Sequence, residues 1–404
     1  MTAASQSHRY SDIPSSRRPA STGTNALAPI AIIGAGPAGL LLARFFERSR
    51  IAYTVFERDQ GPEIRSGSGT LDVRPITGQL ALKQAGLLDR FNALARHGVS
   101  TTIVDAQANV LLNAGGKEDK ERPEIDRRDL QRLLQEAVPL DKVVWGSKVE
   151  TVSRAADGVM TIHMADQTTL SGFRLVIGAD GAWSKVRPLL TPAVPQYSGI
   201  VFYTTYVQPD DAGYPVADSL AQQGNYLAMS GTRKIFLHYL SDRSYFLSVG
   251  LDVAEGQSDK SSLQNGAVLW ESLLKDKFQD WTPKLVDLVR QSDGAFRAWP
   301  LYNLPVEAVA SQWTSVQGVT LVGDAAHLTV PTGDGVNNAL FDSLELATQI
   351  TEHGIDRLDD AVAEYEKPML VRARAAIEKG HWTAEKLFGP GAPHSFFRAM
   401  GVDM

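Results

Sequence analysis

The feature that most constrains this chain is the run from Ile30 to Asp59, IAIIGAGPAGLLLARFFERSRIAYTVFERD. Its first four residues are all apolar, which predicts a strand buried on both faces in a parallel sheet. A glycine turn follows, then a helix from Pro37 and a second strand over 53–56 that ends at Glu57. These segments form a βαβ unit, so we expect an α/β fold built on a parallel sheet.

Three glycines follow the first strand at the spacing Gly34-x-Gly36-x-x-Gly39. In a dinucleotide site the first permits a tight turn, the second lets the backbone approach a pyrophosphate, and the third brings helix against strand. The helix N-terminus supplies roughly half a positive charge, and Glu57 can accept a hydrogen bond from a ribose hydroxyl. We therefore expect a bound dinucleotide, with a purely structural turn as the alternative. Arg58 could pair with an NADP phosphate, but the neighbouring acid favours a free 2'-hydroxyl.

Two later segments repeat the pattern of a buried strand that runs into a glycine-containing turn. They are FRLVIGADGAWSKVR over 173–187 and VTLVGDAAH over 319–327, and the second leads to the loop PTGDGVNN at the head of a helix. Asp324 would end its strand, where its carboxylate can accept hydrogen bonds from ribityl hydroxyls, and Gly323 leaves room for them. These segments favour FAD as the dinucleotide, with a helix cap as the alternative role for Asp324.

The middle of the chain has a different composition. Between about 190 and 300, alternating runs such as VFYTTYV and SYFLSVG predict a mixed sheet inserted between parts of the first domain. Alternation between 143 and 170 predicts a small antiparallel sheet, and 359–388 predicts a long charged helix that braces the fold. We divide the chain into a disordered leader over 1–27 (an organellar transit peptide is the alternative), an FAD-binding domain over 28–104, 125–187 and 301–355, a substrate-binding domain over 105–124 and 188–300, and a C-terminal helix and tail over 356–404.

Composition excludes several functions. The 404 residues carry a net charge of -6, which is too acidic for general nucleic-acid binding. There is no cysteine, so thiolate metal sites and cysteine nucleophiles are excluded, and any redox chemistry must come from a cofactor. No apolar run approaches the ~20 residues of a membrane helix. We expect a cytoplasmic protein that is a monomer or a weak homodimer.

Three motifs in order, GAGPAG with FER, GADGAWSKVR and GDAAHLTVPTGDGVNNAL, resemble the single-component (class A) FAD-dependent aromatic hydroxylases among the flavoprotein monooxygenases. Within that class, RSGSGTLDVRPITGQLALKQAGLL and PEIDRRDLQRLL are most similar to the tetracycline-inactivating monooxygenases. The resemblance covers nearly all of residues 29–385. It implies a Rossmann-like FAD-binding domain of the GR2 type, an inserted mixed β-sheet substrate domain and a long C-terminal helix.

The resemblance also assigns residues to the cofactor. It implies contacts to the ADP half of FAD, to the ribityl chain and to the pyrimidine edge of the flavin ring, and it lets the Asp-Gly pair of the second motif bridge FAD and transiently bound NAD(P)H. The implied cofactor-binding residues are Gly34, Gly36, Ala38, Gly39, Glu57, Arg58, Arg65, Asp72, Arg127, Asp180, Gly181, Asp324, Pro331, Gly333, Gly335, Val336 and Asn337. For any one of the arginines, a solvated surface charge is the alternative.

The chemistry implied by the resemblance is oxygen insertion. In that class NAD(P)H reduces tightly bound FAD, dioxygen forms a flavin hydroperoxide, and one oxygen passes to an aromatic or polycyclic small molecule. The chain has one glycine motif of this kind with strand context, so NAD(P)H is expected to visit rather than reside. We expect an NAD(P)H-dependent monooxygenase that hydroxylates or epoxidises its substrate in natural-product metabolism or drug inactivation. The alternatives are a flavin oxidase or dehydrogenase without oxygen insertion, and a non-catalytic flavoprotein-like module that sequesters a ligand.

Candidate substrate contacts come from the inserted sheet. Tyr203, Tyr226, Phe236 and Phe246 suit a flat, apolar ligand, although strand aromatics also fill cores. Tyr203 and Tyr226 stand where the tetracycline-inactivating enzymes carry a glutamine and an arginine, which speaks against tetracycline as the natural substrate.

Two residues are candidate catalytic groups. His238 is a candidate general base because imidazole titrates near neutral pH, and a hydrogen-bonded structural histidine is the alternative. Asp334, in the middle of PTGDGVNN, is a candidate acceptor of a substrate proton or hydrogen bond. An acid stabilised by the helix dipole at a helix N-terminus is the alternative for Asp334.

Overall fold

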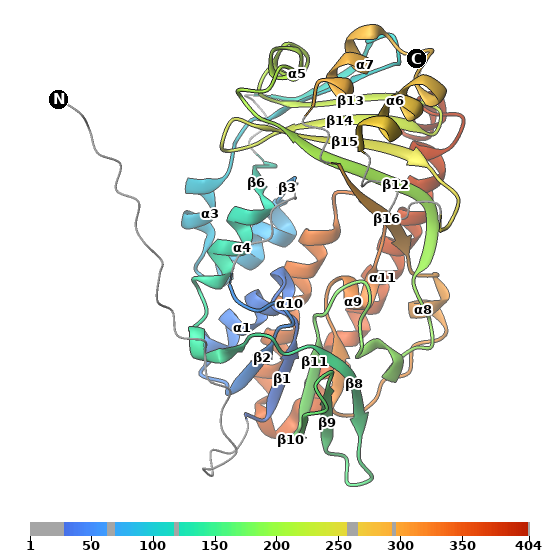
Figure 1. The fold of residues 1–404 in the computed structure, drawn as a ribbon. Helices are drawn as coiled ribbons and strands as arrows, with labels where there is room; N and C mark the ends of the chain where they lie inside the picture. Colours follow the sequence, from blue (N-terminus) through green and yellow to red (C-terminus); the bar gives the residue numbers. More distant parts are fainter. Residues whose placement is uncertain (1–27, 63–68, 117–120, 257–265, 293–295, 403–404) are drawn as a thin grey trace, which may run out of the picture.

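The computed structural model describes residues 28–62, 69–116, 121–256, 266–292 and 296–402. The predicted leader over 1–27 and the predicted FAD contact of Arg65 lie outside these residues. The described chain has an α/β fold with a parallel sheet towards one end and a larger mixed sheet towards the other (Figure 1). The predicted combination of a parallel sheet, a mixed sheet and a long C-terminal helix is confirmed.

The parallel sheet has five strands in the order β17-β11-β1-β2-β7. All residues of β1, β11 and β17 are buried, because apolar layers cover both faces of a parallel sheet, and this holds even for the edge strand β17. The two strands predicted for the βαβ unit are present at the predicted residues. The five strands are β1 (Ile30–Ile33), β2 (Tyr53–Phe56), β7 (Val143–Val144), β11 (Leu175–Gly178) and β17 (Val319–Leu321).

The turns that follow β1, β11 and β17 carry the three sequence motifs. The three strands are adjacent and parallel, so their carboxyl ends lie at the same edge of the sheet. In open α/β sheets, ligands bind outside the carboxyl ends of the strands. Segments that are up to about 290 residues apart in the chain are thereby brought to one site.

Helices pack around this sheet. Helix α1 (Pro37–Ser49) joins β1 to β2 and buries Leu40, Leu41, Phe45 and Phe46, as predicted. It packs against α4 (Arg127–Gln135) and α10 (Gly335–His353), and the short helices α2 (Leu80–Gln84) and α3 (Leu88–Leu94) pack against each other and beside these two. Since α10 begins within PTGDGVNN, its packing on α1 positions that loop.

Two small sheets complete the cofactor half. The predicted antiparallel sheet is present as β8 (Val149–Arg154), β9 (Met160–Met164) and β10 (Thr169–Phe173). A two-stranded sheet of β3 (Thr70–Asp72) and β6 (Glu124–Asp126) was not predicted, and in Figure 1 it lies between the two large sheets. It therefore places polar residues at the junction of the two halves.

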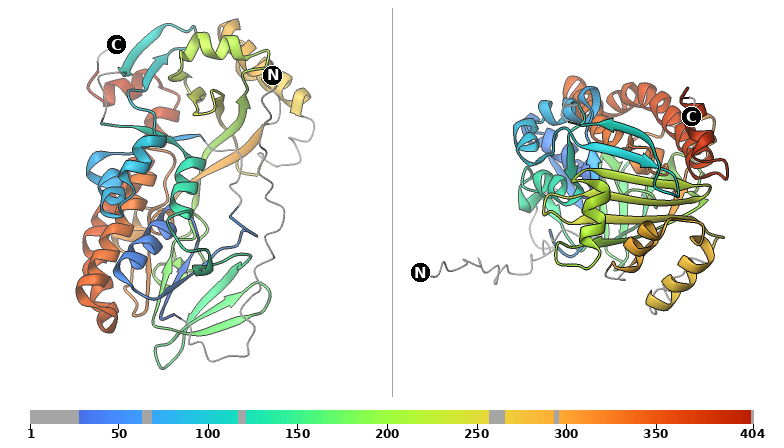
Figure 2. Two further views of the ribbon diagram at one scale, coloured as in Figure 1. Left: turned by 90° about the vertical axis from the view of Figure 1, so that its left-hand side faces the viewer. Right: turned by 90° about the horizontal axis from the view of Figure 1, so that it is seen from above.

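The larger sheet has seven strands in the order β16-β12-β15-β14-β13-β4-β5. All neighbouring pairs are antiparallel except β13 and β4. Its strands begin before residue 105 and end beyond residue 300, so they overrun the predicted limits of the substrate domain. The right-hand view of Figure 2 shows most of them side by side in yellow-green. They are β4 (Ser100–Val104), β5 (Val110–Gly115), β12 (Gln196–Val207), β13 (Asn225–Ser230), β14 (Arg233–Tyr239), β15 (Tyr245–Asp252) and β16 (Arg297–Asn303).

The two faces of this sheet have different neighbours. One face packs on α5 (Tyr214–Ala221), α6 (Gly266–Lys277) and α7 (Pro283–Arg290), and its buried core joins Leu237 and Val249 to Leu285 of α7. These helices lie above the sheet in Figure 1, and the cofactor half lies below it. Because alternate residues of a strand face opposite sides, the register divides every strand between a core face and a cofactor-side face.

The predicted long helix is α11 (Leu358–Phe388), whose 31 residues span about 46 Å. It contacts β17 of the parallel sheet and both β12 and β16 of the large sheet, so it links the two halves. Three short helices complete the described chain, α8 (Glu307–Ala310), α9 (Asp324–His327) and α12 (His394–Ala399). Within the described ranges, none of the helices combines the length and apolarity needed to cross a membrane.

Candidate cofactor and active site

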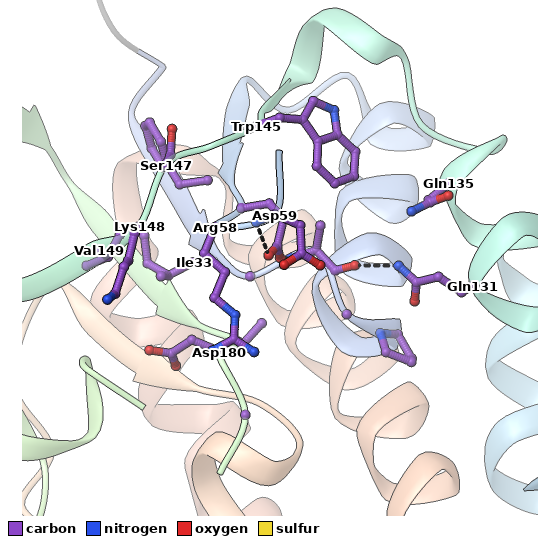
Figure 3. A pocket seen from close by; sticks show the side chains of 18 of the residues that line it. Ile33, Arg58, Asp59, Gln131, Gln135, Trp145, Ser147, Lys148, Val149 and Asp180 are labelled. Atoms are coloured by element: carbon purple, nitrogen blue, oxygen red, sulfur yellow. Dashed lines mark hydrogen bonds between the residues drawn. The ribbon is translucent and has the colours of Figure 1, made fainter. Parts of the chain in front are cut away.

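A cavity of about 450 Å³ opens at the edge of the parallel sheet where the glycine turn lies. It is formed by the turn after β1, the end of β2, one face of α4, and the turn after β11 (Figure 3). Among the sequence-predicted cofactor residues, the cavity is lined by Gly34, Gly36, Glu57, Arg58, Arg127, Asp180 and Gly181. Ala38 and Gly39 are buried in the first turn of α1, behind the cavity wall.

Each of the three motif positions carries glycine for a different geometric reason. Gly34 has φ of +107°, and a Cβ there would lie 2.5 Å from the carbonyl oxygen of Ala179. A Cβ on Gly39 would lie 2.0 Å from the carbonyl oxygen of Gly34, so helix and strand could not approach. At Gly36 no described atom lies within 4 Å of that position, and the residue lines the cavity. Gly36 thus leaves open space at a helix N-terminus, where an anionic pyrophosphate is favoured.

Glu57 is fixed by backbone amides. Its Oε2 accepts a hydrogen bond of 2.7 Å from the Ala35 amide, and its Oε1 accepts one of 2.9 Å from the Asp59 amide. Each carboxylate oxygen retains a further lone pair that can accept from a ribose hydroxyl. Arg58 is exposed beside it and lines the same cavity. The acid is therefore held in position before any ligand binds.

Helix α4 supplies cavity residues that sequence reasoning missed, among them Gln131 and Gln135. They line the cavity at successive four-residue steps from the predicted Arg127, so the three residues share one helix face. Gln131 donates a hydrogen bond of 2.8 Å to the carbonyl oxygen of Ala35, which ties α4 to the glycine turn (Figure 3). The four-residue spacing was a signal available in the sequence. Trp145, Ser147 and Lys148, which follow β7, also line the cavity and had no such signal.

Asp180 and the neighbouring Arg187 organise the second motif. Oδ2 of Asp180 accepts a hydrogen bond of 2.7 Å from the Lys185 amide, whereas its Oδ1 is buried and has no hydrogen-bond partner among the described residues. The enclosed position of this carboxylate raises its pKa. An orphaned buried oxygen at the cavity wall is consistent with a ligand donor that completes it.

Arg187 joins the second motif to the third. It is 3% exposed, and its guanidinium donates to the carbonyl oxygens of Ala325 and Ala182 at 2.8 Å and of Gly181 and Asp324 at 3.2 Å. The side chain therefore locks the turn after β11 to the turn after β17. Arg187 is the last residue of the motif GADGAWSKVR, and the sequence alone did not indicate its role.

Asp324 is the first residue of α9, directly after β17. The N-cap position of α9 belongs to Gly323, so the alternative that Asp324 is the helix cap is not supported. The negative charge of Asp324 acts on the guanidinium groups of both Arg127 and Arg187. Asp324 is exposed, and its carboxylate thus lies near both arginines.

A buried ion pair holds the Asp324 turn from behind. Nε2 of His327 lies 2.6 Å from Oδ2 of Asp342, and the same carboxylate accepts from the Gly323 amide at 3.0 Å and from Arg372 at 3.2 Å. Burial alone would lower the pKa of His327, but the Asp342 carboxylate raises it. Burial alone would raise the pKa of Asp342, but His327 lowers it. Each residue thus favours the charged form of the other, and the pair supports the turn from outside the cavity.

The loop over 331–337 is bound to the segment after β3. Asn337 is buried, its Nδ2 donates to the carbonyl oxygen of Asp72 at 2.9 Å and to that of Gly333 at 3.2 Å, and its Oδ1 accepts from the Arg74 amide at 2.8 Å. The remaining predicted residues of the loop, Pro331, Gly333, Gly335 and Val336, are exposed or half-buried. The loop backbone is thus anchored at one point and accessible elsewhere.

Asp334 occupies the N-cap position of α10, and its carboxylate contacts two cations. Its Oδ1 pairs with Nη1 of Arg74, and its Oδ2 pairs with Nζ of Lys379 in α11. A second ion pair, between Arg74 and Asp72 at 3.3 Å, extends the group. Both oxygens of Asp334 thus contact cations, and the hypothesis that this carboxylate accepts a substrate proton or hydrogen bond stays a prediction.

The predicted substrate aromatics divide between the two faces of the large sheet. Tyr203 and Tyr226 are buried in the core with Leu285 of α7. This placement argues against the prediction that they contact substrate, since alternate residues of a strand face opposite sides and theirs is the core face. Phe236 and Phe246 lie on the cofactor-side face, where Phe236 is parallel to His238 with 6.2 Å between ring centroids.

His238 lies on the cofactor-side face near two arginines. Burial, with the positive charges of Arg96 and Arg127, lowers the pKa of His238 to about 4. The imidazole is therefore neutral at physiological pH and only weakly basic. Its Nδ1 is buried and has no hydrogen-bond partner in the part of the chain that the structure describes, so the alternative of a fully hydrogen-bonded structural histidine is not supported either.

The residues at the cavity fit the adenosine diphosphate half of FAD. Gly36 and the N-terminus of α1 provide the approach for a pyrophosphate, and Glu57 provides an acceptor for the ribose. Asp324, which ends the turn after β17, is exposed, and the backbone of the 331–337 loop is accessible at four of its predicted residues, so both could contact the second half of the dinucleotide.

Comparisons with known proteins identify the same cofactor. Residues 28–282 match the family model described as the FAD binding domain. The chain is 31% identical to the monooxygenase penA of Penicillium thymicola, covering 86% of this chain and 93% of that protein.

Two solved structures share the fold. Klebsiella pneumoniae HpxO complexed with FAD and uric acid has a TM-score of 0.75 and 22% identity, covering 92% of this chain and 91% of HpxO. The tetracycline destructase Tet(51) has a TM-score of 0.67 and 20% identity, covering 93% and 95% of the two chains. The predicted resemblance to class A flavoprotein monooxygenases, including the fold of the tetracycline-inactivating enzymes, is confirmed. The chain belongs to the FAD-binding-domain family and is a single-component FAD-dependent monooxygenase.

Proposed function

We propose that this monooxygenase consumes NAD(P)H and dioxygen and inserts one oxygen atom into an aromatic or polycyclic small molecule by hydroxylation or epoxidation. The observation that carries the proposal is the combination of a cofactor cavity with an aromatic sheet face. The glycine cavity fits the adenosine diphosphate half of FAD, and the face of the large sheet that bears Phe236, His238 and Phe246 is the one opposite its helix-covered core, towards the cofactor half (Figure 1). An aromatic wall beside a flavin path suits a flat, apolar substrate with a few hydrogen-bonding groups.

The chain's own residues have positional tasks in this reaction. FAD, when bound, supplies the redox and oxygen-transfer chemistry. Arg187 fixes the relative position of the second and third motifs, and Asn337 anchors the loop that would meet the flavin ring. The large sheet and its helices close one side of the site, and excluding water there favours oxygen transfer over side reactions.

We further propose that NAD(P)H binds transiently. A resident second dinucleotide would be expected to have its own glycine motif after a buried strand, and the sequence offers one such motif, at Gly34. We also propose the division into an FAD-binding domain and an inserted substrate-binding domain, with the substrate domain extended to include β4 and the end of β16.

The test is substrate-stimulated oxidation of NADH and NADPH by the purified, FAD-loaded protein. Aromatic polyketides, indole alkaloids and tetracyclines would be screened, with mass spectrometry to detect a gain of one oxygen in the product. The expected result is a yellow protein whose NAD(P)H consumption rises with at least one compound and matches the oxygenated product formed.

Two outcomes would contradict the proposal. Stimulated NAD(P)H oxidation that yields only hydrogen peroxide would support the oxidase alternative. Tight binding of a compound with neither NAD(P)H oxidation nor product would support the sequestering alternative. The Gly36→Ala variant serves as the control, because it places a methyl group in the open space of the cofactor cavity and should remove FAD-dependent turnover without removing the fold.

A further inference from the structure

A row of side chains crosses the cofactor-side face of the large sheet near its junction with β6. Asn225 of β13 lies directly opposite His238 of β14, and His238 lies directly opposite Phe246 of β15. Directly opposed residues project from the same face of a sheet. The row therefore presents an amide, an imidazole and a phenyl ring side by side.

Contacts with the cofactor half fix the direction of this row. Nδ2 of Asn225 donates a hydrogen bond of 2.6 Å to Oε1 of Glu124 in β6. A Cβ built on Gly69, just before β3, would lie 2.8 Å from the ring of Phe246. His238 experiences the positive charge of Arg127, which in turn experiences the negative charge of Asp324. The row thus faces β6 and the residue before β3, at the junction with the cofactor half.

Two buried polar atoms in this row lack partners. Oδ1 of Asn225 and Nδ1 of His238 are both shielded from solvent, and neither makes a hydrogen bond to any described residue. Buried polar atoms in folded proteins are nearly always paired, so two neighbouring exceptions on one face need an explanation. One explanation is a bound molecule that supplies the missing hydrogen-bond partners of both atoms.

The framework around Asn225 defines which hydrogen bonds a ligand must make. The amide nitrogen of Asn225 donates to Glu124. The other amide atom of Asn225 is therefore its oxygen, which can only accept a hydrogen bond. Arg96 holds the neighbouring strand through Asp126 at 2.6 Å and Thr70 at 2.8 Å. Asn225 Oδ1 is thus an acceptor that is fixed in place. Nδ1 of neutral His238 can either donate or accept, depending on which ring nitrogen carries the proton.

We propose that Asn225 and His238 form the polar edge of the substrate subsite and select a planar aromatic substrate that carries a ring N–H or phenolic O–H donor. Asn225 Oδ1 accepts from that donor, His238 Nδ1 meets an adjacent polar group, and Phe236 and Phe246 cover the ring faces. This inference rests on the proposed function, because it requires the substrate to lie between this sheet face and the flavin.

The test measures binding rather than turnover. The FAD-loaded enzyme is titrated with 2-quinolone and N-methyl-2-quinolone, and with 2-naphthol and 2-methoxynaphthalene, following changes in the flavin absorption spectrum. We expect the member of each pair with the donor to bind about tenfold more tightly, because its methylated partner leaves Asn225 Oδ1 buried and unpaired. Equal binding within both pairs, or binding by none of the four, overturns the proposal.

Variants separate the subsite from general damage. Asn225→Leu should abolish the preference for the donor within each pair. His238→Phe keeps the parallel ring beside Phe236 and should weaken binding of the donor compounds by a similar factor. Tyr239→Phe is the matched control, because Tyr239 follows His238 on β14, packs against the core and contacts the ring of Tyr245 with 5.2 Å between ring centroids. FAD content and melting temperature identify any variant that fails to fold.

Failure of this inference can be told apart from failure of the proposed function. Donor preference that disappears in Asn225→Leu supports the subsite even if no compound is oxygenated. Oxygenation of a compound whose affinity is unchanged in Asn225→Leu and His238→Phe supports the function and overturns the subsite. Donor preference that persists in both variants also overturns it, since the selecting groups must then lie elsewhere.

Discussion

The cofactor cavity and the facing surface of the large sheet differ in how their polar side chains are held. Around the cavity, Glu57, Arg187 and Asp342 each make several hydrogen bonds that join separate turns. Even Asp180, whose Oδ1 is unpaired in the described part of the chain, is fixed through Oδ2 by the Lys185 amide. On the sheet face, Asn225 Oδ1 and His238 Nδ1 are buried without partners among the described residues. The first region is preorganised for a cofactor shared by a whole family, and we propose that the second binds the substrate.

This contrast predicts different consequences of mutation. Changes around the cavity should alter folding and FAD binding, because the side chains there hold the backbone that holds the cofactor. Changes on the sheet face should alter which compounds bind, because we propose that Asn225 and His238 there bind the substrate.

The largest effect is expected from Gly39→Ala. Its Cβ would lie 2.0 Å from a backbone oxygen of Gly34, so α1 and β1 cannot keep their approach. We expect most of the protein to be insoluble or to lack FAD. In Gly36→Ala the methyl group enters open space, so the melting temperature of the apoprotein should be near wild type while FAD affinity falls. Melting curves and FAD content per chain check both, and equal behaviour of the two variants would contradict this account.

Arg187→Met should have the next largest effect. It removes the donor for four carbonyl oxygens in a nearly fully buried position, and we expect a loss of about 3 kcal/mol in the free energy of unfolding. Arg187→Lys should recover only part of this, because an ammonium lacks the planar fork. Urea unfolding measures the difference. A loss below that of an ordinary surface substitution would mean that Arg187 does not join the two turns.

His327→Gln should reduce stability in a pH-dependent manner. The raised pKa of His327 means that the stabilisation from its charge is fully present below its unfolded value of about 6.5 and is lost as pH rises through the folded value. The lowered pKa of Asp342 means that its contribution is present above about pH 4 and is lost as pH falls through its folded value.

The difference between wild type and His327→Gln should therefore be largest at about pH 4 to 6.5, on the order of 2 kcal/mol, and should shrink at alkaline pH. Unfolding in urea at about pH 5.5 and about pH 9 gives the comparison. A difference that grows with rising pH would show that the pair is not charged in the folded protein.

Asp334→Asn should have the smallest effect. The ion pairs with Arg74 and Lys379 are partly exposed, so their loss should change stability by less than about 1 kcal/mol. If the carboxylate is engaged by these cations rather than by substrate, the rate of product formation and its pH profile should stay near wild type. A rate loss of a hundredfold or more with an altered pH profile would restore the base role. Lys379→Met, which removes one partner, is the matched variant.

Much of the fold could be predicted from local pattern. The apolar run of β1, the glycine spacing and the end of β2 at Glu57 follow from periodicities and turn chemistry within about 30 residues. The same holds for α11, where helical periodicity extends over 31 residues. The order of the three motifs indicated the family, because each motif reports a turn after a strand of one sheet.

Contacts between distant segments could not be predicted. The pairing of Asp334 with Lys379 joins a loop to a helix 45 residues further along the chain, and no local pattern links them. The assignment of Tyr203 and Tyr226 to a sheet face required the register of β12 and β13, since a shift by one residue reverses every side chain. Arg187 acts through backbone carbonyl oxygens, which leave no trace in side-chain composition.

The most direct test of the central claim is the source of the oxygen in the product. A compound that stimulates NAD(P)H oxidation is incubated with the FAD-loaded enzyme and NAD(P)H under dioxygen enriched in a heavy oxygen isotope. The molecular mass of the product is then measured by mass spectrometry. The account predicts one heavy oxygen atom per product molecule and one product molecule per NAD(P)H consumed. Product without the heavy isotope, or hydrogen peroxide in place of product for every NAD(P)H consumed, would contradict it.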